Sequence, residues 1–174
     1  MNSLLLKVDS EIELRLQTLD DADEEWLLLT ESIGHLSQWV DWAQPTYTEA
    51  DMRRDMASNV EKYEAGKMYA MGIYFGKKLI GNVDVRDIID GESAEVGYFL
   101  AKHYTGRGIA TRSAQTLMDY VQAKHNVRRF CLTTYKDNDS SKKVAERLGF
   151  QCISEHVADN GRQESRYQKH VAEE

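Results

Sequence analysis

The sequence has little proline and little cysteine. It contains one Pro and two Cys among 174 residues. A single proline excludes a proline-rich linker or recognition tract, and two cysteines are too few for the disulfide framework of a small secreted domain. Cys131 and Cys152 both lie in apolar stretches typical of strands. We therefore expect two buried free thiols.

Long apolar runs and an excess of basic residues are also missing. The leucines at 4–6 form a run too short for a signal-peptide core or a membrane span. Lys and Arg number 22 against 29 Asp and Glu, which gives a net charge of −7. Without a basic excess, the chain is poorly suited to neutralise nucleic-acid phosphates. The sequence predicts a cytoplasmic protein that binds neither nucleic acid nor membrane, and its acidity fits a cationic partner such as an amine or a basic peptide.

Enough apolar material is present for one core. Hydrophobic residues make up 41% of the chain and charged residues 29%, a composition typical of a globular protein. No internal repeat, low-complexity segment or Ser/Gly linker divides the sequence. We therefore expect a single domain over residues 1–174.

The N-terminal part of the chain predicts a strand and then a helix. Residues 11–17 alternate between apolar and polar, which is the period of a half-buried strand. Asp20 and Asp21 can cap a helix, and the apolar residues that follow recur at helical spacing as far as Ile33.

A second helix is predicted beyond an aromatic stretch. Residues 35–45 predict a short helix and a turn that ends at Pro45. Thr48 and Asp51 have the spacing of a capping box, with Asp in place of Glu. Behind this box, one apolar stripe at helical spacing predicts a core-facing helix: Met52, Met56, Val60 and Tyr63.

From residue 67 onward the spacing of the apolar residues changes from a helical period to every second residue, as in a strand. Three stretches joined by short turns predict an antiparallel meander, at residues 69–75, 79–88 and 94–101. A helix after residue 109 and a strand at 129–135 then predict a parallel crossover. A short helix at 140–148, followed by two strands (150–157 and 163–171) around Asn160-Gly161, completes a mixed α+β sheet.

The loop at residues 104–111 carries the clearest sign of a ligand site. It leaves a strand and opens a helix, and its two glycines, Gly106 and Gly108, let a ligand approach the backbone. The first amides of a helix have no intrahelical partner, and the helix dipole favours an anion there. Arg107 adds a cation. The loop lacks the Gly-Lys-Ser/Thr of a Walker loop, and the antiparallel meander before it does not fit a Rossmann fingerprint.

Three segments resemble the GNAT superfamily of acetyltransferases. Residues 105–110 (TGRGIA) match the Gly and Ala positions of the family's loop Gln/Arg-x-x-Gly-x-Gly/Ala, with Thr105 in place of Gln or Arg. Residues 94–100 resemble the family's fourth strand, and residues 138–150 resemble its Asn-x-x-Ser segment and Leu-Gly-Phe ending. The resemblance extends over about residues 11–171. The stretch at 35–45 and the helix after it are similar to the RimJ/RimL branch, which acetylates ribosomal-protein N-termini.

The resemblance implies a fold, a cosubstrate and the residues that hold it. The fold is a mostly antiparallel, twisted sheet that splays at the acetyl-CoA site and is flanked by helices. Acetyl-CoA is the cosubstrate and no metal takes part, in line with five histidines that show no metal-ligand spacing. The implied acetyl-CoA-binding residues are Tyr98, Phe99, Leu100, Thr105, Gly106, Arg107, Gly108, Ile109, Ala110, Thr111, Asn138 and Ser141.

The resemblance also implies roles in the transfer. Ser141 is the expected acid that protonates the departing thiolate, and a main-chain N–H near Phe99 is the expected oxyanion donor. Glu95 is the expected base, while Glu155, His156 or a water molecule stay open as alternatives.

The sequence says less about the acceptor substrate than about the acetyl-CoA site. At pH 7, freeing an α-amine of pKa ~8 costs about 1.4 kcal/mol, against about 4.6 kcal/mol for a lysine of pKa ~10.4. The absence of an evident strong base therefore favours an α-amine at a protein N-terminus. Trp39, Trp42 and Tyr47 are the residues expected to line the acceptor cleft. A small-amine acetyltransferase and a non-catalytic acyl-CoA-binding module are the alternatives, and a homodimer paired through C-terminal strand edges is also open.

Overall fold

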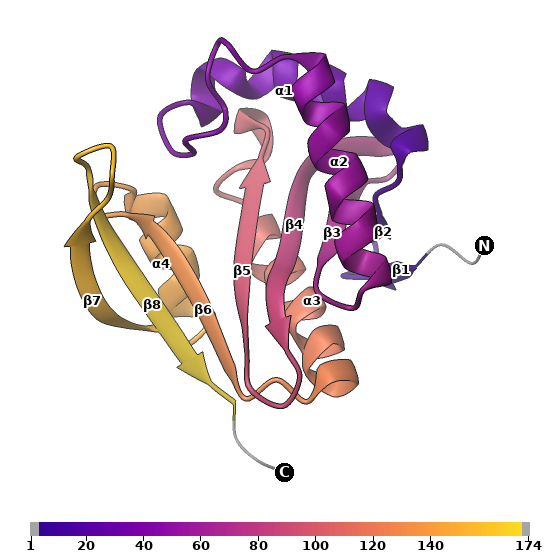
Figure 1. The fold of residues 1–174 in the computed structure, drawn as a ribbon. Helices are drawn as coiled ribbons and strands as arrows, with labels where there is room; N and C mark the ends of the chain where they lie inside the picture. Colours follow the sequence, from indigo (N-terminus) through magenta and orange to yellow (C-terminus); the bar gives the residue numbers. More distant parts are fainter. Residues whose placement is uncertain (1–3, 172–174) are drawn as a thin grey trace.

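One eight-stranded sheet forms the centre of the molecule. The computed structural model describes residues 4–171, so the ends of the predicted domain 1–174 lie outside the described residues. The sheet order is β1-β2-β3-β4-β5-β6-β8-β7 (Figure 1). In chain order the strands are β1 (Leu5–Lys7), β2 (Ile12–Leu16), β3 (Tyr69–Phe75), β4 (Lys78–Ile89), β5 (Ser93–Leu100), β6 (Arg129–Tyr135), β7 (Gln151–Val157) and β8 (Gln163–His170).

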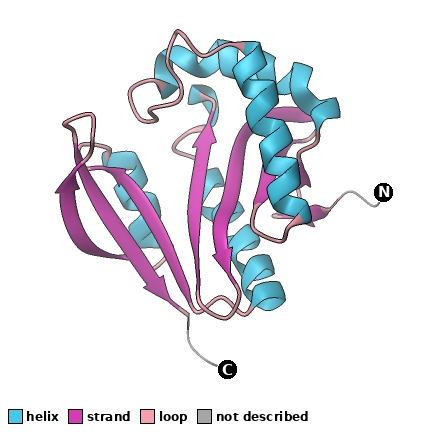
Figure 2. Ribbon diagram, in the orientation of Figure 1, coloured by secondary structure: helices cyan, strands magenta, loops and turns pink. Residues whose placement is uncertain are grey.

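Helices cover both faces of this sheet (Figure 2). One face carries α1 and α2, and the other carries α3 and α4. The helices are α1 (Ala22–Leu36), α2 (Glu49–Glu64), α3 (Ile109–His125) and α4 (Asp139–Arg147), with two 3₁₀ turns, η1 (Leu19–Asp21) and η2 (Lys102–Tyr104). The predicted mixed α+β fold is confirmed.

The sheet opens between β5 and β6. Every neighbouring pair is antiparallel except β5 and β6, which run parallel. These two strands pair only at Ser93–Glu95 with Arg129–Cys131, although β5 continues to Leu100 and β6 to Tyr135. Figure 1 shows them side by side at one end and apart at the other. The predicted parallel crossover through α3 is therefore present, and it leaves main-chain groups of the second half of β5 facing an opening.

The main core lies between the sheet and α3. Leu117, Met118 and Val121 of α3 pack on side chains of β3 and β4 such as Met71 and Val83. On the opposite face, α1 and α2 close smaller clusters, with Met52 and Met56 buried as their stripe predicts. The meander strand β3 is buried on both sides because helices cover both faces.

The ends of the helices follow from their capping residues. The Thr48–Asp51 capping box starts α2 as predicted, with the Thr48 hydroxyl accepting the Asp51 N–H. Asp21 precedes α1, but its carboxylate accepts the Thr18 N–H at 2.8 Å instead of a helix amide. Asn138 caps α4, and Gly149 ends it with a φ of +83°.

Two expectations are wrong. Residues 35–45 do not form a separate short helix: α1 continues to Leu36, and residues 37–48 form turns. Cys131 is buried, but Cys152 is exposed. The reason is that every residue of the edge strand β7 is exposed, so its apolar side chains contribute nothing to the core. The strand β1 is an element that the sequence did not predict.

Candidate active site

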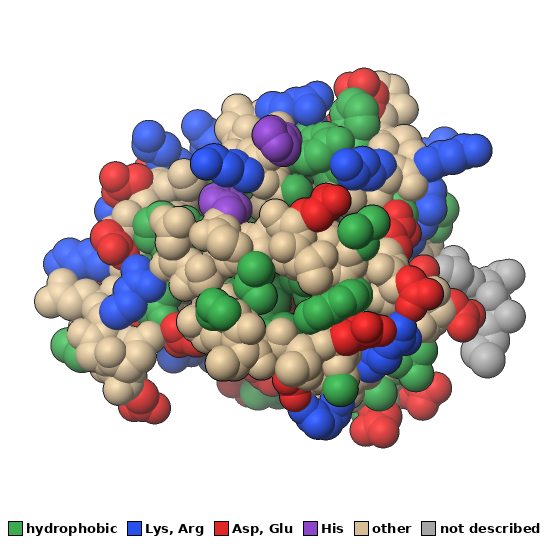
Figure 3. All heavy atoms as spheres, turned by 90° about the horizontal axis from the view of Figure 1, so that it is seen from above, with side chains coloured by type: hydrophobic (Ala, Val, Ile, Leu, Met, Phe, Trp, Pro, Cys, Tyr) green, Lys and Arg blue, Asp and Glu red, His purple; other side chains and the backbone are tan. Residues whose placement is uncertain are grey.

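A cavity of about 990 Å³ occupies the opening between β5 and β6. Most of its lining comes from α1, the segment 37–48, α2, the strands β4 to β6, the first turn of α3, and α4. Figure 3 looks down on this end of the molecule and shows hydrophobic side chains in a hollow, with charged side chains of both signs around it. The size and mixed lining are those of a site for a cofactor-sized ligand.

The start of α3 forms one wall and presents free helix amides. Gly106 and Gly108 have φ angles of +75° and +70°, in the left-handed region that glycine adopts without strain. Gly108 is the N-cap residue and supplies no side chain, so the first amides of α3 receive no side-chain cap. The Thr111 hydroxyl is buried without a hydrogen-bond partner. An anion bound at this turn would accept from these groups.

The side chains of Thr105 and Arg107, which were expected to contact the bound anion of acetyl-CoA, make other contacts. The Arg107 guanidinium lies over the rings of Phe75 and Tyr104, 5.2 and 5.8 Å from their centroids, and Arg107 does not line the cavity. The Thr105 hydroxyl donates to the carbonyl of Lys102 at 2.7 Å. The backbone of the loop therefore contributes more to the cavity than these two side chains do.

Cations reach the cavity from α4 instead. Lys143 and Arg147 lie one turn apart on this helix, and both line the cavity. They were not predicted from the sequence, although their spacing of four residues places them on one helix face.

Tyr98 of β5 and Ser141 of α4 are in contact at the cavity. Their hydroxyl oxygens are 2.9 Å apart, and both residues line the cavity. Burial raises the pKa of Tyr98 to about 12, so its hydroxyl stays protonated at neutral pH. The Asn138 side-chain oxygen accepts the Ser141 N–H at 3.1 Å, which fixes the first turn of α4. Asn138, which is expected to bind acetyl-CoA, and the expected acid Ser141 are thus brought together with Tyr98.

The three aromatic residues expected at the acceptor all line the cavity. Trp42 lies 5.5 Å from Tyr47 and 5.8 Å from Phe99, measured between ring centroids. The Tyr47 hydroxyl donates to Asp55 at 2.6 Å. Trp39 is the third, and the Arg162 guanidinium lies 6.0 Å from its ring centroid. This wall is both aromatic and acidic.

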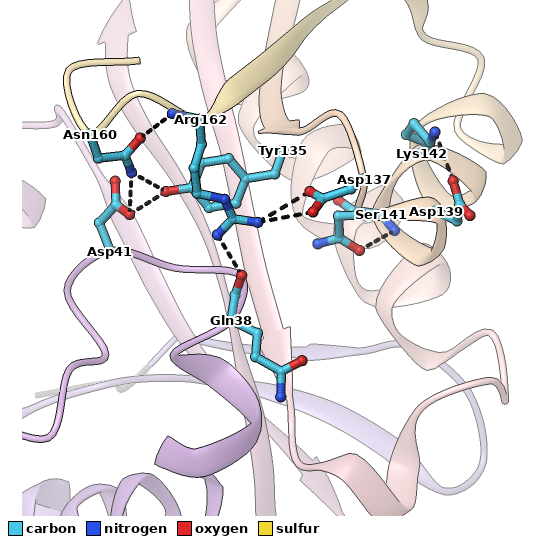
Figure 4. A network of polar contacts seen from close by, with 10 residues as sticks. Gln38, Asp41, Tyr135, Asp137, Asp139, Ser141, Lys142, Asn160 and Arg162 are labelled. Atoms are coloured by element: carbon cyan, nitrogen blue, oxygen red, sulfur yellow. Dashed lines mark hydrogen bonds and ion pairs between the residues drawn. The ribbon is translucent and has the colours of Figure 1, made fainter. Parts of the chain in front are cut away.

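A polar network joins the acceptor wall to the C-terminal hairpin (Figure 4). Asp41 accepts hydrogen bonds from the Tyr135 hydroxyl and from the Asn160 amide. The Arg162 guanidinium stacks 3.5 Å from the Tyr135 ring centroid and donates to the carbonyl of Gln38 at 2.7 Å. The segment 37–48, the end of β6 and the β7–β8 turn are thereby held together. We call these five residues the hairpin clasp.

Glu95 lies outside the cavity lining. Its carboxylate accepts from Arg86 at 2.8 Å, and the same guanidinium binds Asp84 at 2.6 Å. The alternatives Glu155 and His156 are exposed residues of β7, paired with Lys136 and Glu164 respectively. The sequence prediction of Glu95 as base stays a prediction, and the ion pair with Arg86 does not favour it.

Glu25 of α1 is a buried carboxylate of the cavity that was not predicted from the sequence. It lines the cavity and is only 4% exposed. Asn82 donates to one of its oxygens and Gln17 to the other, each at 2.7 Å. Its spacing of three and four residues from Ala22 and Leu29 places it on the buried face of α1, and this spacing was the available signal.

Comparison with known protein families gives a result consistent with this site. The model of the acetyltransferase (GNAT) domain family matches residues 12–151. The chain belongs to the GNAT acetyltransferase family. Among GNAT relatives, the ribosomal-protein-serine acetyltransferase of Escherichia coli (strain K12) is 28% identical over 146 residues, which cover 83% of this chain and 82% of that protein.

Solved GNAT structures show the same fold. The RimL ribosomal L7/L12 alpha-N-protein acetyltransferase in complex with coenzyme A superposes with a TM-score of 0.90 at 23% identity, covering 97% of this chain and 98% of that one. The microcin C7 self-immunity acetyltransferase MccE, in complex with acetyl-CoA and AMP, gives a TM-score of 0.87 at 24% identity, with 95% of each chain covered.

This GNAT protein is an N-acetyltransferase that uses acetyl-CoA. The site fits that cosubstrate on its own evidence. The uncapped start of α3, the unpartnered Thr111 hydroxyl and the two cations of α4 suit a phosphate-bearing ligand. Within residues 4–171, no three His, Cys, Asp or Glu side chains are grouped as metal ligands, and no helix is long and apolar enough to cross a membrane.

Proposed function

We propose that this enzyme acetylates the N-terminal α-amine of a protein, in particular of a ribosomal protein. The E. coli relative is named a ribosomal-protein-serine acetyltransferase, and the RimL structure is that of a ribosomal L7/L12 alpha-N-protein acetyltransferase. The observation that carries the proposal is a single cavity lined by the uncapped start of α3, by the hydrogen-bonded pair Tyr98–Ser141 and by an acidic, aromatic wall.

The cosubstrate is proposed to bind along β5 and at the start of α3. Its pyrophosphate is held by the amides of residues 106–110, by Thr111 and by the cations Lys143 and Arg147. Its pantetheine arm pairs with main-chain groups of residues 98–100, which face the opening left by β6. When bound, acetyl-CoA supplies the acetyl thioester.

Ser141 is proposed to protonate the departing thiolate. Its hydroxyl lies at the opening, held 2.9 Å from a Tyr98 hydroxyl that stays protonated at neutral pH. A main-chain N–H near Phe99 is proposed to stabilise the tetrahedral oxyanion, a contribution of roughly 3 kcal/mol for such a donor.

The acceptor is proposed to enter beside the segment 37–48. Trp39, Trp42 and Tyr47 supply apolar contact there. The wall also carries carboxylates, which attract a cationic amine and repel an acidic one: Glu25, Asp41, Asp55, Asp84 and Glu164.

The test is release of the CoA thiol from acetyl-CoA with short Ser-, Ala- and Met-starting peptides, compared with polyamines and amino sugars. We expect turnover on the peptides, at least tenfold above the small amines in kcat/KM. Turnover confined to small amines would contradict the proposed acceptor. Tight acetyl-CoA binding without turnover on any amine would instead favour a binding module.

A further inference from the structure

Glu25 is a carboxylate in an apolar helix face. The other buried residues of α1 are Ala22, Leu28, Leu29, Ser32 and Leu36. A buried carboxylate is costly unless it has partners or a role. Among the described residues, no Lys, Arg or His forms an ion pair with Glu25. A purely structural carboxylate would gain more from a cation, so this position requires another explanation.

The partners of Glu25 orient it without neutralising it. Asn82 of β4 donates to Oε1 and Gln17 to Oε2, each at 2.7 Å. Gln17 also donates to the Asn82 side-chain oxygen at 3.3 Å, which closes a triangle of three side chains. A carboxylate has about four lone-pair sites, so one neutral donor on each oxygen leaves capacity for a proton or an ammonium group. All three residues line the cavity.

The position of Asn82 places Glu25 beside the proposed acetyl site. Asn82 lies directly opposite Phe99 in the pairing of β4 with β5. Directly opposed side chains in a sheet project from the same face, and Phe99 packs on the clusters under α1, next to Trp42. Glu25 therefore approaches β5 from the acceptor side. Tyr98, one residue earlier, projects from the opposite face and contacts Ser141.

We propose that Glu25 is the base of the transfer and takes a proton from the ammonium group of the acceptor. This inference rests on the proposed transfer to a primary amine. One proton passes from the nitrogen to the Glu25 carboxylate, and the neutral nitrogen forms the new N–C bond with the acetyl carbonyl. The second nitrogen proton passes to solvent as the C–S bond breaks, and the thiolate takes a proton from Ser141, which solvent water then reprotonates. Base and acid thus act from opposite faces of β5.

The surroundings give Glu25 the basicity that this role needs. Burial raises its pKa to about 7, against an ordinary value of 4.5, and the carboxylates of Asp21 and Glu24 add to the rise. Tyr47, from the segment 37–48, also faces it. The two hydrogen-bond partners of Glu25 are uncharged: Gln17, which follows β2, and Asn82 of β4. A base of this strength matches an α-amine of pKa ~8.

The test compares pH–rate profiles of wild type, Glu25→Gln and Glu31→Gln on a Ser-starting peptide between pH 6 and 9.5. We expect Glu25→Gln to lower kcat/KM about 100-fold or more at pH 6.5. The loss should shrink to less than about tenfold at pH 9.5, because an α-amine is then already neutral. Glu31→Gln removes the same charge from an exposed position of α1 and should stay within about twofold of wild type at every pH.

A ratio of Glu25→Gln to wild type that does not change with pH, or no loss at all, would overturn the role of Glu25. Glu25→Asp keeps a carboxylate, so its loss of kcat/KM at pH 6.5 should be smaller than that of Glu25→Gln; an Asp variant as impaired at pH 6.5 as the Gln variant would count against the proposal. Acetyl-CoA binding by calorimetry, expected to be unchanged within about threefold, shows that each variant is folded.

Wild-type turnover on peptides tests the acceptor separately. If wild type acetylates only a small amine, the proposed acceptor fails, and the same pH profiles run on that amine still decide whether Glu25 is the base.

Discussion

Ser141 is the proposed proton donor to the departing thiolate, and its hydroxyl lies 2.9 Å from the Tyr98 hydroxyl. Removing the hydroxyl should slow protonation of the thiolate while leaving the α3 amides and the α4 cap intact. We expect Ser141→Ala to lower kcat about 100-fold, with KM for acetyl-CoA changed less than threefold. Steady-state kinetics by thiol release measures both constants.

Ser140→Ala is the matched control, since it removes a hydroxyl from the same helical turn at an exposed position. It should retain kcat within about twofold. Equal kcat for Ser141→Ala and wild type would remove Ser141 from the chemistry.

Glu25 also predicts a pH-dependent effect on stability. Its pKa is about 7 in the folded protein and 4.5 in its ordinary environment, so the folded state holds a proton that the unfolded state has released. The free energy of unfolding therefore falls, through this group, as the pH rises from 4.5 to 7, by on the order of 3 kcal/mol. Glu25→Gln should be more stable than wild type at pH 8 and gain little at pH 4.5. Urea unfolding at both pH values measures the difference, and equal stability at pH 8 would contradict it.

Residue-level prediction succeeded where the signal is local. Gly106, Gly108 and Asn138 belong to short motifs, and the structure gives each the backbone or capping geometry that the motif needs. Glu25 could not be recognised as part of a site, because its partners Gln17 and Asn82 come from other parts of the chain. The burial of Cys152 was predicted wrongly because an apolar strand pattern does not show whether anything packs on it.

Close packing of β4 against β5 depends on Gly81. A Cβ atom at this position would lie 2.2 Å from the carbonyl oxygen of Phe99 and 2.9 Å from the Cα of Leu100. Both are backbone atoms, so β5 would have to move where the pantetheine arm is proposed to pair. We expect Gly81→Ala to destabilise the protein by about 2 kcal/mol and to raise KM for acetyl-CoA at least fivefold. Thermal unfolding and initial rates check the two effects.

Gly34→Ala is the control for Gly81→Ala, because it adds the same methyl group at a glycine that has open space around it. Gly34 lies in α1, and a methyl group added there would meet no atom within 4 Å beyond its own stretch of helix backbone. Alanine should therefore stabilise the helix by about 0.5–1 kcal/mol. For Gly81→Ala itself, wild-type stability together with a wild-type KM for acetyl-CoA would contradict the prediction. It would show that the close approach of Gly81 to the β5 backbone is not required.

Strands and helices with a clear period were predictable as elements. The strands β4 and β5 and the helix α3 bury residues at a regular period, so hydrophobic spacing located them. The segment 37–48 was not, because its tryptophans line the cavity instead of a helix face. Spacing alone cannot distinguish an aromatic loop from a short amphipathic helix.

At the scale of the molecule, the hairpin clasp links the acceptor wall to the C-terminal hairpin. Arg162 is its central residue, with contacts to Gln38, Tyr135 and Asp137. We expect Arg162→Ala to raise KM for the acceptor peptide about tenfold and to leave KM for acetyl-CoA within twofold. Hydrogen exchange of the segment 37–48 should become faster in the same variant.

Arg166→Ala provides the comparison, because Arg166 is an exposed arginine on β8, the strand that begins directly after Arg162. It should leave both KM values and the exchange rates unchanged. If Arg162→Ala raised only the KM for acetyl-CoA, the hairpin clasp would not support the acceptor wall, and the prediction would be contradicted.

The cavity itself could not be predicted from the sequence. Its existence depends on β5 and β6 separating after Glu95 and Cys131, and no local sequence pattern marks the residue at which two paired strands separate. The acidic wall likewise combines residues from α1, the segment 37–48, α2, β4 and β8. The Gly-rich loop at residues 104–111 and the resemblance to a known family pointed to a ligand site here before the structure did.

The central claim is transfer to an α-amine. It is tested most directly with one peptide that begins with Ser and contains an internal Lys, incubated with acetyl-CoA and analysed by fragmentation mass spectrometry. At pH 7 the lysine costs about 3 kcal/mol more to deprotonate than the α-amine, a factor of more than 100. We predict the acetyl group on the N-terminal nitrogen, with the lysine unmodified at early times. Faster labelling of the lysine would contradict transfer to the α-amine.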